Sequence, residues 1–174
     1  MAKSDRFEAL VMPHLDAAYN LARWLVHDPH LAEDIVQEAC VRAFRFLDQL
    51  RGEHARPWFL GIVRNACFDH LREPRPAQFH PDADEDDVDT GRFGVEERTP
   101  ESILLQKCST SQVDTAIAAL PAAYREVIVL REMEEMSYDL IAEVAGVPIG
   151  TVMSRLSRAR GMLRAALLPL VRES

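Results

Sequence analysis

The sequence predicts an all-α protein in which two small helical domains are joined by an acidic linker. In both halves, apolar residues recur every three or four positions, as on one face of a helix, and no useful length alternates apolar and polar residues. A stretch rich in proline and acidic residues separates the halves. Its composition divides the 174 residues into a first domain at 1–73, a linker at 74–108 and a second domain at 109–174.

The first half carries three amphipathic segments and little glycine, so we expect a compact helical bundle. Asp28-Pro29 indicates a turn that joins two helices. The apolar positions that mark the three segments are Phe7, Leu10, Val11, Leu15, Ala18, Ala22 and Leu25, then Ile35, Ala39, Ala43, Phe46, Leu47 and Leu50, and finally Phe59, Ile62, Val63 and Ala66.

The linker holds most of the negative charge. Between residues 73 and 101 there are ten acidic and three basic residues, which accounts for seven of the eight net negative charges. Prolines, like charges and few large apolar residues disfavour a packed core there. A calcium-binding EF-hand does not fit these acids. A loop starting at Asp82 has Phe93 at its twelfth position, and one starting at Asp86 has Val88 at a ligand position.

Neither a metal site nor a cofactor is predicted. Cys40, Cys67 and Cys108 lie far apart without a Cys-x-x-Cys pair, so we expect reduced thiols, with Cys40 and Cys67 as small buried side chains. His27 and His30 flank the predicted turn rather than forming a ligand pair. The chain has no run of roughly 18 apolar residues and begins with a charged segment, so we expect a cytoplasmic protein without membrane insertion.

Two helices are predicted after the linker, one ending near Pro121 and the next near Met136. Their apolar positions are Val113, Ile117 and Leu120, and then Tyr124, Val127, Ile128 and Leu130. They lead directly into the most informative segment of the chain, residues 137–160.

Residues 137–160 have the pattern of a helix-turn-helix. Ser137 suits the N-cap of the first helix, and the small Ala142 allows another helix to cross closely. Gly146 suits the turn, and Pro148 suits the first turn of the second helix. The pattern therefore predicts two helices joined by a turn.

The second helix of this motif has two different faces. One arc of about 60° is apolar and is formed by Val152, Leu156, Ala159 and Leu163. Another arc of about 100° is polar and is formed by Thr151, Ser154, Arg155 and Arg158. Arginine pairs with guanine edges or phosphates, and hydroxyl groups bond to either, so the polar arc suits the major groove of DNA. The arginines, together with Arg160 and Arg164, would also suit an ordinary solvated surface.

The same segment strongly resembles region 4 of extracytoplasmic-function (ECF) sigma factors. Their pattern Ser-Tyr-x-x-Ile-Ala-x-x-x-Gly-Val-Pro-x-Gly-Thr-Val-x-Ser-Arg-Leu-x-Arg-Ala-Arg is matched from Ser137 to Arg160, and Leu120-Pro121 followed by residues 125–130 resembles the opening helices of that region. Residues 32–38 resemble the region 2 helix that docks on the polymerase, and residues 58–69 resemble its promoter-reading helix. Two signatures in the right order cover nearly all of the chain outside the linker.

The resemblance implies a region 2 bundle and a region 4 helix-turn-helix in a sigma factor that is not an enzyme. It implies three partners: bacterial core RNA polymerase, through its largest-subunit clamp and its flap, promoter DNA, and an anti-sigma factor. Melting would use captured single-stranded bases, which fits the absence of a Gly-x-x-x-x-Gly-Lys phosphate loop. We also hypothesise that the acidic linker runs along the polymerase channel meant for nucleic acid, imitating its charge.

The resemblance also implies three sets of contact residues. The residues implied for core polymerase are Asp34, Gln37 and Glu38. Those implied for the minus 10 element are Asn65, Asp69, Arg72 and Trp58. Those implied for the minus 35 element are Thr151, Ser154, Arg155, Arg158 and Arg160. An ordinary solvated face for the first set, and a plain core position for Trp58, remain open alternatives.

Two further positions affect how a promoter would be recognised. The polar loop at residues 48–56 would form the pocket that captures a flipped base. Met153 stands where many relatives carry Lys or Arg, and this departure puts one minus 35 contact in question.

Two other function classes fit parts of the sequence. A helix-turn-helix regulator acting without polymerase should footprint its site alone. A net charge of minus eight with one short basic face disfavours that activity. An enzyme would need His14, His54 or His70 as acid or base, but no set of nucleophile, base and orienting residue is found among them.

Overall fold

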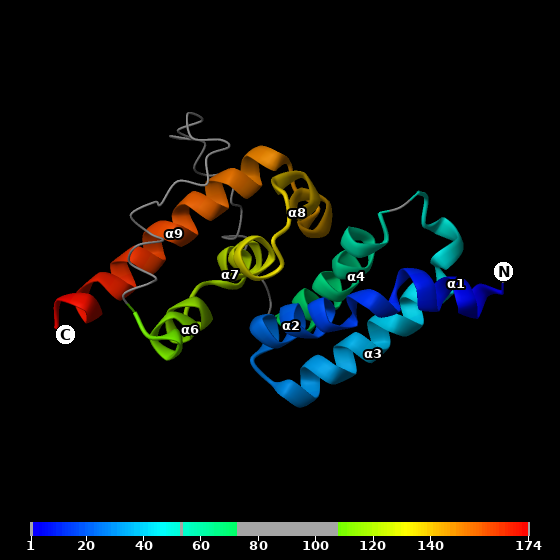
Figure 1. Ribbon diagram of the computed structural model, residues 1–174, viewed down its shortest axis with the longest axis horizontal. Coiled ribbons are helices and arrows are strands. Elements are labelled where there is room, and N and C mark those ends of the chain that lie inside the picture. Colours follow the sequence, from blue (N-terminus) through cyan, green and yellow to red (C-terminus); the bar gives the residue numbers. More distant parts are fainter. Residues whose placement is uncertain (1, 53, 73–107, 174) are drawn as a thin grey trace.

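The computed structural model describes residues 2–52, 54–72 and 108–173. Within these ranges every regular element is a helix, which confirms the predicted all-α class (Figure 1). The elements are α1 (Lys3–Leu10), η1 (Met12–His14), α2 (Leu15–Val26), α3 (Pro29–Arg45), η2 (Leu47–Gln49), α4 (Ala55–His70), α6 (Thr110–Ala118), α7 (Ala122–Ile128), η4 (Val129–Met133), α8 (Tyr138–Ala145) and α9 (Ile149–Arg172). The predicted linker, apart from Cys108, lies outside the described residues, so the domain boundaries remain predictions.

The connection between α2 and α3 shows why the first bundle folds as it does. α2 ends at His27, whose φ of 58° places it in the left-handed region. The Asp28 carboxylate then caps α3 by accepting hydrogen bonds from the N–H groups of His30 and Leu31, at 3.0 and 3.2 Å. Pro29 occupies the first helical turn, where its missing N–H costs nothing. The predicted turn at Asp28-Pro29 is confirmed.

The helix-turn-helix also has the predicted local structure. The Ser137 hydroxyl accepts a hydrogen bond from the Leu140 N–H at 3.3 Å, which caps α8. Gly146 ends α8 with a φ of 67°, a conformation that glycine adopts without strain. Pro148 is the N-cap of α9, just before the first helical turn rather than within it. The axes of α8 and α9 meet at a bend of 99°.

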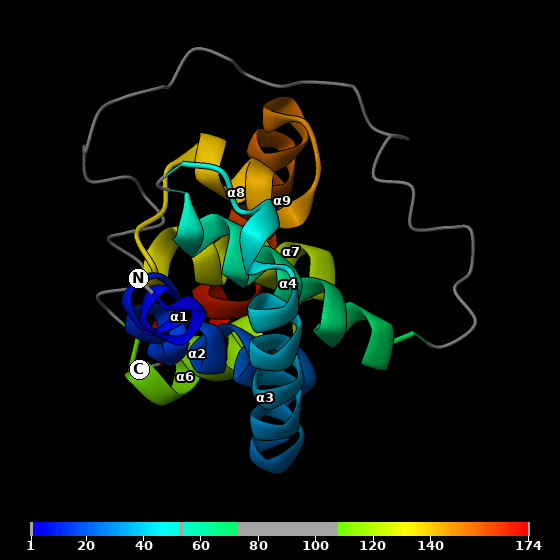
Figure 2. The same cartoon turned by 90° about the vertical axis from the view of Figure 1, so that its right-hand side faces the viewer.

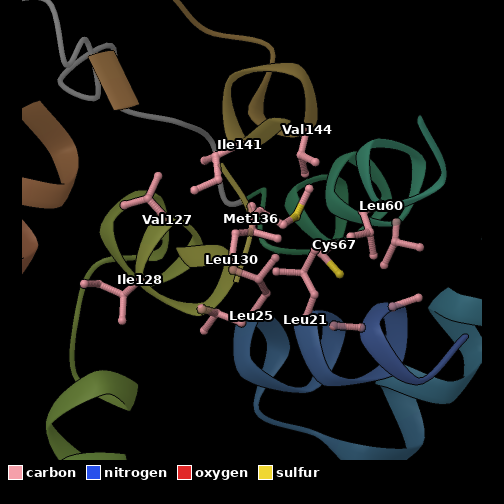
Figure 3. Packing of buried hydrophobic residues seen from close by; sticks show 14 of the residues in the cluster. Leu21, Leu25, Leu60, Cys67, Val127, Ile128, Leu130, Met136, Ile141 and Val144 are labelled. Carbon is pink, nitrogen blue, oxygen red and sulfur yellow. The ribbon is translucent and has the colours of Figure 1, made fainter. Parts of the chain in front are cut away.

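The helices of the two predicted domains share one continuous core. α4 packs along α8, and α2 packs against α7 and η4. Figure 3 shows apolar side chains of these five elements, and of Met136 between η4 and α8, pointing toward one another across the boundary. The labelled ones are Leu21, Leu25, Leu60, Cys67, Val127, Ile128, Leu130, Met136, Ile141 and Val144. The sequence predicted two domains but no packing between them.

α4 and α8 approach each other closely at Gly61. A Cβ atom built on Gly61 would lie 3.6 Å from the Val144 carbonyl oxygen, an ordinary van der Waals contact with no room beyond it. A larger side chain at this position would push the two helices apart. The interface between the domains therefore depends on a small residue in α4.

Phe46, one of the apolar positions of the second predicted segment, and Cys40 are more exposed than the sequence predicted. Phe46 is 43% exposed, because α3 ends at Arg45 and Phe46 leaves the helical register that the spacing assumed. Cys67 is buried as predicted, whereas Cys40 is only half-buried.

Among the described residues no single helix is long and apolar enough to cross a membrane. α8 and α9 together meet that test by length and composition only, and a sharp bend separates them.

Candidate nucleic-acid and polymerase interfaces

The second helix of the helix-turn-helix, α9, carries the residues predicted for the minus 35 element. Thr151, Ser154, Arg158 and Arg160 are half-buried on this helix. The Ser154 hydroxyl donates a hydrogen bond to the Thr151 carbonyl at 3.1 Å. Arg160 forms an ion pair with Glu132 at 3.3 Å, and both side chains remain partly exposed. Thr151, Ser154 and Arg158 therefore share one side of the first half of α9, whereas Arg160 lies on the opposite side of the helix.

Arg155 is placed differently from the other residues of its arc. It is 7% exposed, and its charge acts on the fully buried carboxylate of Glu126. On a helical wheel Arg155 lies only about 40° from Ala159, at the edge of the apolar face. The buried carboxylate explains why a cation at this border turns inward. In this arrangement the Arg155 side chain is largely inaccessible to DNA.

The residues predicted for the minus 10 element lie on and just after α4. Asn65 and Asp69 are exposed one turn apart on this helix, and Arg72 is exposed just beyond its end. The side-chain oxygen of Asn65 accepts a hydrogen bond from Arg64 at 3.2 Å. Trp58 is half-buried and packs against the core, so part of its side chain has a structural role. The structure leaves three polar groups together on the outer side of α4.

The residues predicted for core polymerase form an exposed stripe on α3. Asp34, Gln37 and Glu38 all face solvent. Glu38 forms an ion pair with Arg42 at 3.5 Å and lies 3.9 Å from His70. Val41, 60% exposed, extends the stripe with apolar surface. In Figures 1 and 2, α3 lies on the far side of the bundle from α8 and α9.

The loop predicted to capture a flipped base is held at both ends. Asp48 forms ion pairs with Lys3 and Arg6 at 3.6 and 3.7 Å. At the other end, Arg56 donates to both the carbonyl and the carboxylate of Glu134, at 2.8 and 3.3 Å. Glu134 belongs to the second half of the chain, so this end of the loop is fixed to the other domain. The assignment of the loop as a pocket stays a prediction.

Sequence analysis missed a group of charged residues between the domains. Glu126 is fully buried, Arg125 is 6% exposed, and Arg64 forms an ion pair with Glu126 at 2.6 Å. Burial raises the pKa of Glu126, against the opposing charges of Arg64 and Arg155. One signal was available: two charged residues interrupt the otherwise apolar side of residues 124–130. The periodicity of apolar residues predicted that this helix packs into the core, but it did not indicate which partners the two charged residues would have.

Two protein families match this chain. Sigma-70 region 2 matches residues 10–75, and Sigma-70 region 4 matches residues 110–163. These matches contain α2 to α4, with the predicted polymerase and minus 10 residues, and α6 to the middle of α9, with the predicted minus 35 residues.

Individual relatives agree with the family matches. The chain is 35% identical to the RNA polymerase sigma-H factor of Pseudomonas aeruginosa over 97% of its own length and 89% of that protein. It is 36% identical to the ECF RNA polymerase sigma-E factor of Escherichia coli K12, covering 80% of this chain and 75% of that one.

Two solved structures share the fold. A co-crystal structure of the sigma factor RpoE with the anti-sigma factor NepR from Bartonella quintana superposes with a TM-score of 0.67 and 26% identity, covering 94% of this chain and 97% of that one. A structure of CnrH in complex with the cytosolic domain of CnrY superposes with a TM-score of 0.64 and 25% identity. The match covers 95% of this chain and 90% of that one. The extent of identity to curated relatives, together with both region matches in order, shows that the chain belongs to the sigma-70 family, as an RNA polymerase sigma factor of the ECF type.

Proposed function

We propose that this sigma factor recognises its promoter with two helices and binds polymerase with a third. α9 reads the minus 35 element, α4 reads the minus 10 element, and α3 docks on the clamp of the largest subunit. The observation that carries this division is that the predicted polar residues of α3 and of α4 are exposed, whereas both helices bury their apolar sides. A stripe of acid and amide groups on α3 suits a basic partner surface, and an exposed Asn on α4 suits a single-stranded base.

The rest of the proposal follows the predicted domains. Residues 1–73 act as region 2, residues 109–174 act as region 4 and contact the flap, and residues 74–108 span between them. The protein acts in the cytoplasm, where its polymerase partner is. An anti-sigma factor controls its release, a role supported by the similarity to RpoE, whose structure was solved with the anti-sigma factor NepR.

Run-off transcription tests the function directly. Candidate promoters are transcribed with purified bacterial core polymerase, with and without this protein, alongside a footprint by the protein alone. We expect transcripts only with both components and no footprint by the free protein, because its net charge of minus eight opposes unaided binding to duplex DNA. A clean footprint without polymerase, and no dependence of transcription on it, would make the chain an ordinary DNA-binding regulator.

A variant at Arg158 tests the proposed minus 35 face. Arg158→Ala should weaken promoter binding by the holoenzyme by about 1–3 kcal/mol, the cost of losing one specific base contact. Arg172→Ala removes the same charge from the exposed end of α9, outside the helix-turn-helix, and serves as the matched control. Equal losses from the two variants would argue that α9 contributes only general positive charge.

A further inference from the structure

The first two turns of α9 carry apolar side chains outside the core, next to the polar residues predicted for the minus 35 element. Ile149, the first residue of the helix, is 38% exposed. Met153 lies one turn further on and is half-buried, but within the described residues it does not pack against the hydrophobic core. The start of the proposed reading helix therefore has an apolar surface that the fold itself does not use.

The helical geometry places Met153 at one edge of the outward side of α9. At 100° per residue, Ser157, Gly150 and Ser154 lie within an arc of about 60° opposite the buried side chains. Met153 lies about 40° beyond Ser157, and Arg158 lies about 40° beyond Ser154 at the other edge. A Cβ built on Gly150 would have no neighbour within 4 Å, so the middle of this arc is open. Met153 and Arg158 thus flank the same accessible surface.

A helix that enters the major groove contacts base edges chiefly with its N-terminal residues, and the groove is wide enough for both edges of the helix to meet bases. Most groups on the base edges are hydrogen-bond donors or acceptors, and only thymine presents a methyl group there. An apolar side chain that covers a donor or acceptor leaves it without a partner, which is costly. Against a methyl group the same side chain buries apolar surface, which is favourable. Thymine is therefore the base that suits Met153.

We propose that Met153, with Ile149 beside it, is a specificity-determining residue that selects a thymine in the minus 35 element by contacting its C5-methyl group. Thr151, Ser154 and Arg158 make polar contacts on the adjoining surface. α9 then reads one part of the element by hydrogen bonds and another by apolar contact. This inference rests on the proposed function, in which α9 reads the minus 35 element.

The test begins by finding the element that the protein prefers. Holoenzyme assembled from the full chain and purified bacterial core polymerase transcribes templates randomised at the minus 35 and minus 10 elements, and the active templates are sequenced. We expect thymine, on one of the two strands, to be enriched at a position of the minus 35 element. Met153→Arg should shift the preference at that position from thymine to guanine, whose O6 and N7 accept hydrogen bonds from arginine.

Deoxyuridine then isolates the methyl group, because it pairs as thymidine does but lacks the C5-methyl. Replacing the selected thymidine by deoxyuridine should weaken promoter binding by the wild-type holoenzyme about four-fold, as expected for the loss of one buried methyl-sized group. With Met153→Ala the same replacement should have no such effect, because the contact is already absent. Met153→Leu keeps an apolar side chain of similar size and should retain the dependence on the methyl group.

Met162→Ala is the matched control. Met162 is 41% exposed in the second half of α9, beyond the helix-turn-helix pattern of residues 137–160. The substitution removes the same side chain from the same helix, so the thymine preference and the effect of deoxyuridine should stay as in the wild type. An unchanged preference at the minus 10 element would show that each variant still folds and assembles with polymerase.

Three results would overturn the thymine contact. They are a minus 35 element without an enriched thymine, wild-type binding that is insensitive to deoxyuridine, and a deoxyuridine effect that is as large in Met153→Ala as in the wild type. Failure of the proposed function gives a different result, because transcription would then not depend on the minus 35 sequence. A defined minus 35 element that shows no dependence on the methyl group would reject the contact and leave the proposed function intact.

Discussion

His27 links the acid stability of the protein to the contact between its domains. Burial, and then the nearby charge of Arg125, lower the pKa of His27 below its ordinary value of 6.5. The folded protein therefore favours the neutral imidazole. The stability that results is fully present above about pH 6.5 and is lost as pH falls through the lowered folded-state pKa.

Replacing His27 tests this linkage. We expect urea unfolding of the wild type to become easier between about pH 7 and pH 5, and His27→Asn to flatten that dependence. Asn tolerates the left-handed backbone at this position, so the substitution removes the titration without adding strain. The pKa of His14 is also lowered and that of Glu126 is raised. Both groups are present in the two proteins, so their effects cancel when the two curves of stability against pH are subtracted. Parallel stability curves for the two proteins would contradict the assignment.

Cys67 should be the least reactive of the three cysteines. Burial, and then the negative charge of Glu126, raise its pKa to about 12, an increase that the positive charge of Arg64 opposes. Cys40 and Cys108 are half-buried and so more accessible to reagents. Because only the thiolate attacks, timed alkylation at pH 8 followed by mass spectrometry should find Cys67 modified last. In urea all three should react at similar rates, and rapid native labelling of Cys67 would show that the interface opens readily.

At the scale of elements, the packing of α4 on α8 depends on Gly61. Gly61→Ala places a methyl group in ordinary contact with Val144 and improves helix propensity, so the free energy of unfolding should be unchanged or rise by up to about 1 kcal/mol. Gly61→Ile should lower it by about 1–3 kcal/mol, because the extra carbons meet the backbone of α8. Urea denaturation measures both changes.

Gly161 provides the control for this pair of variants. It lies in α9, and a Cβ there would have no neighbour within 4 Å. Gly161→Ile should therefore show only the small effect of helix propensity. If Gly61→Ile and Gly161→Ile behaved alike, close packing of α4 on α8 would not be the cause.

At the scale of the whole molecule, the two halves fold onto a single core. Leu21 and Leu25 of α2 face Leu130 and Met136 of the second half in Figure 3, and all four are buried. Burying a leucine side chain is worth about 1.5–3 kcal/mol, so the apolar contact supplies most of the attraction between the halves. The buried charges contribute less net energy, but they help to align the halves, because Arg125 and Glu126 each bond to a group of the first half.

Local patterns in the sequence predicted most of the helices and the family, but not the break between α1 and α2 at Met12–His14. Apolar periodicity predicted the helices, and local groups such as Asp28, Ser137 and Gly146 marked their ends, because caps and turns depend on residues within a few positions of each other. The region 2 and region 4 signatures predicted a sigma factor of the ECF type, to which the chain belongs. Asn65 and Asp69, four residues apart, are both exposed on one face of α4, as their spacing predicted.

How the two halves meet could not be read from the sequence. Arg64 and Glu126 are 62 positions apart, and no local pattern states that such residues will pair. Arg155 is buried near the carboxylate of Glu126. A helical wheel describes only the angles around one helix, so it grouped Arg155 with the exposed residues of α9. Packing between distant segments is set by shape and charge in three dimensions, and it is this packing that closes the two halves of the protein onto each other.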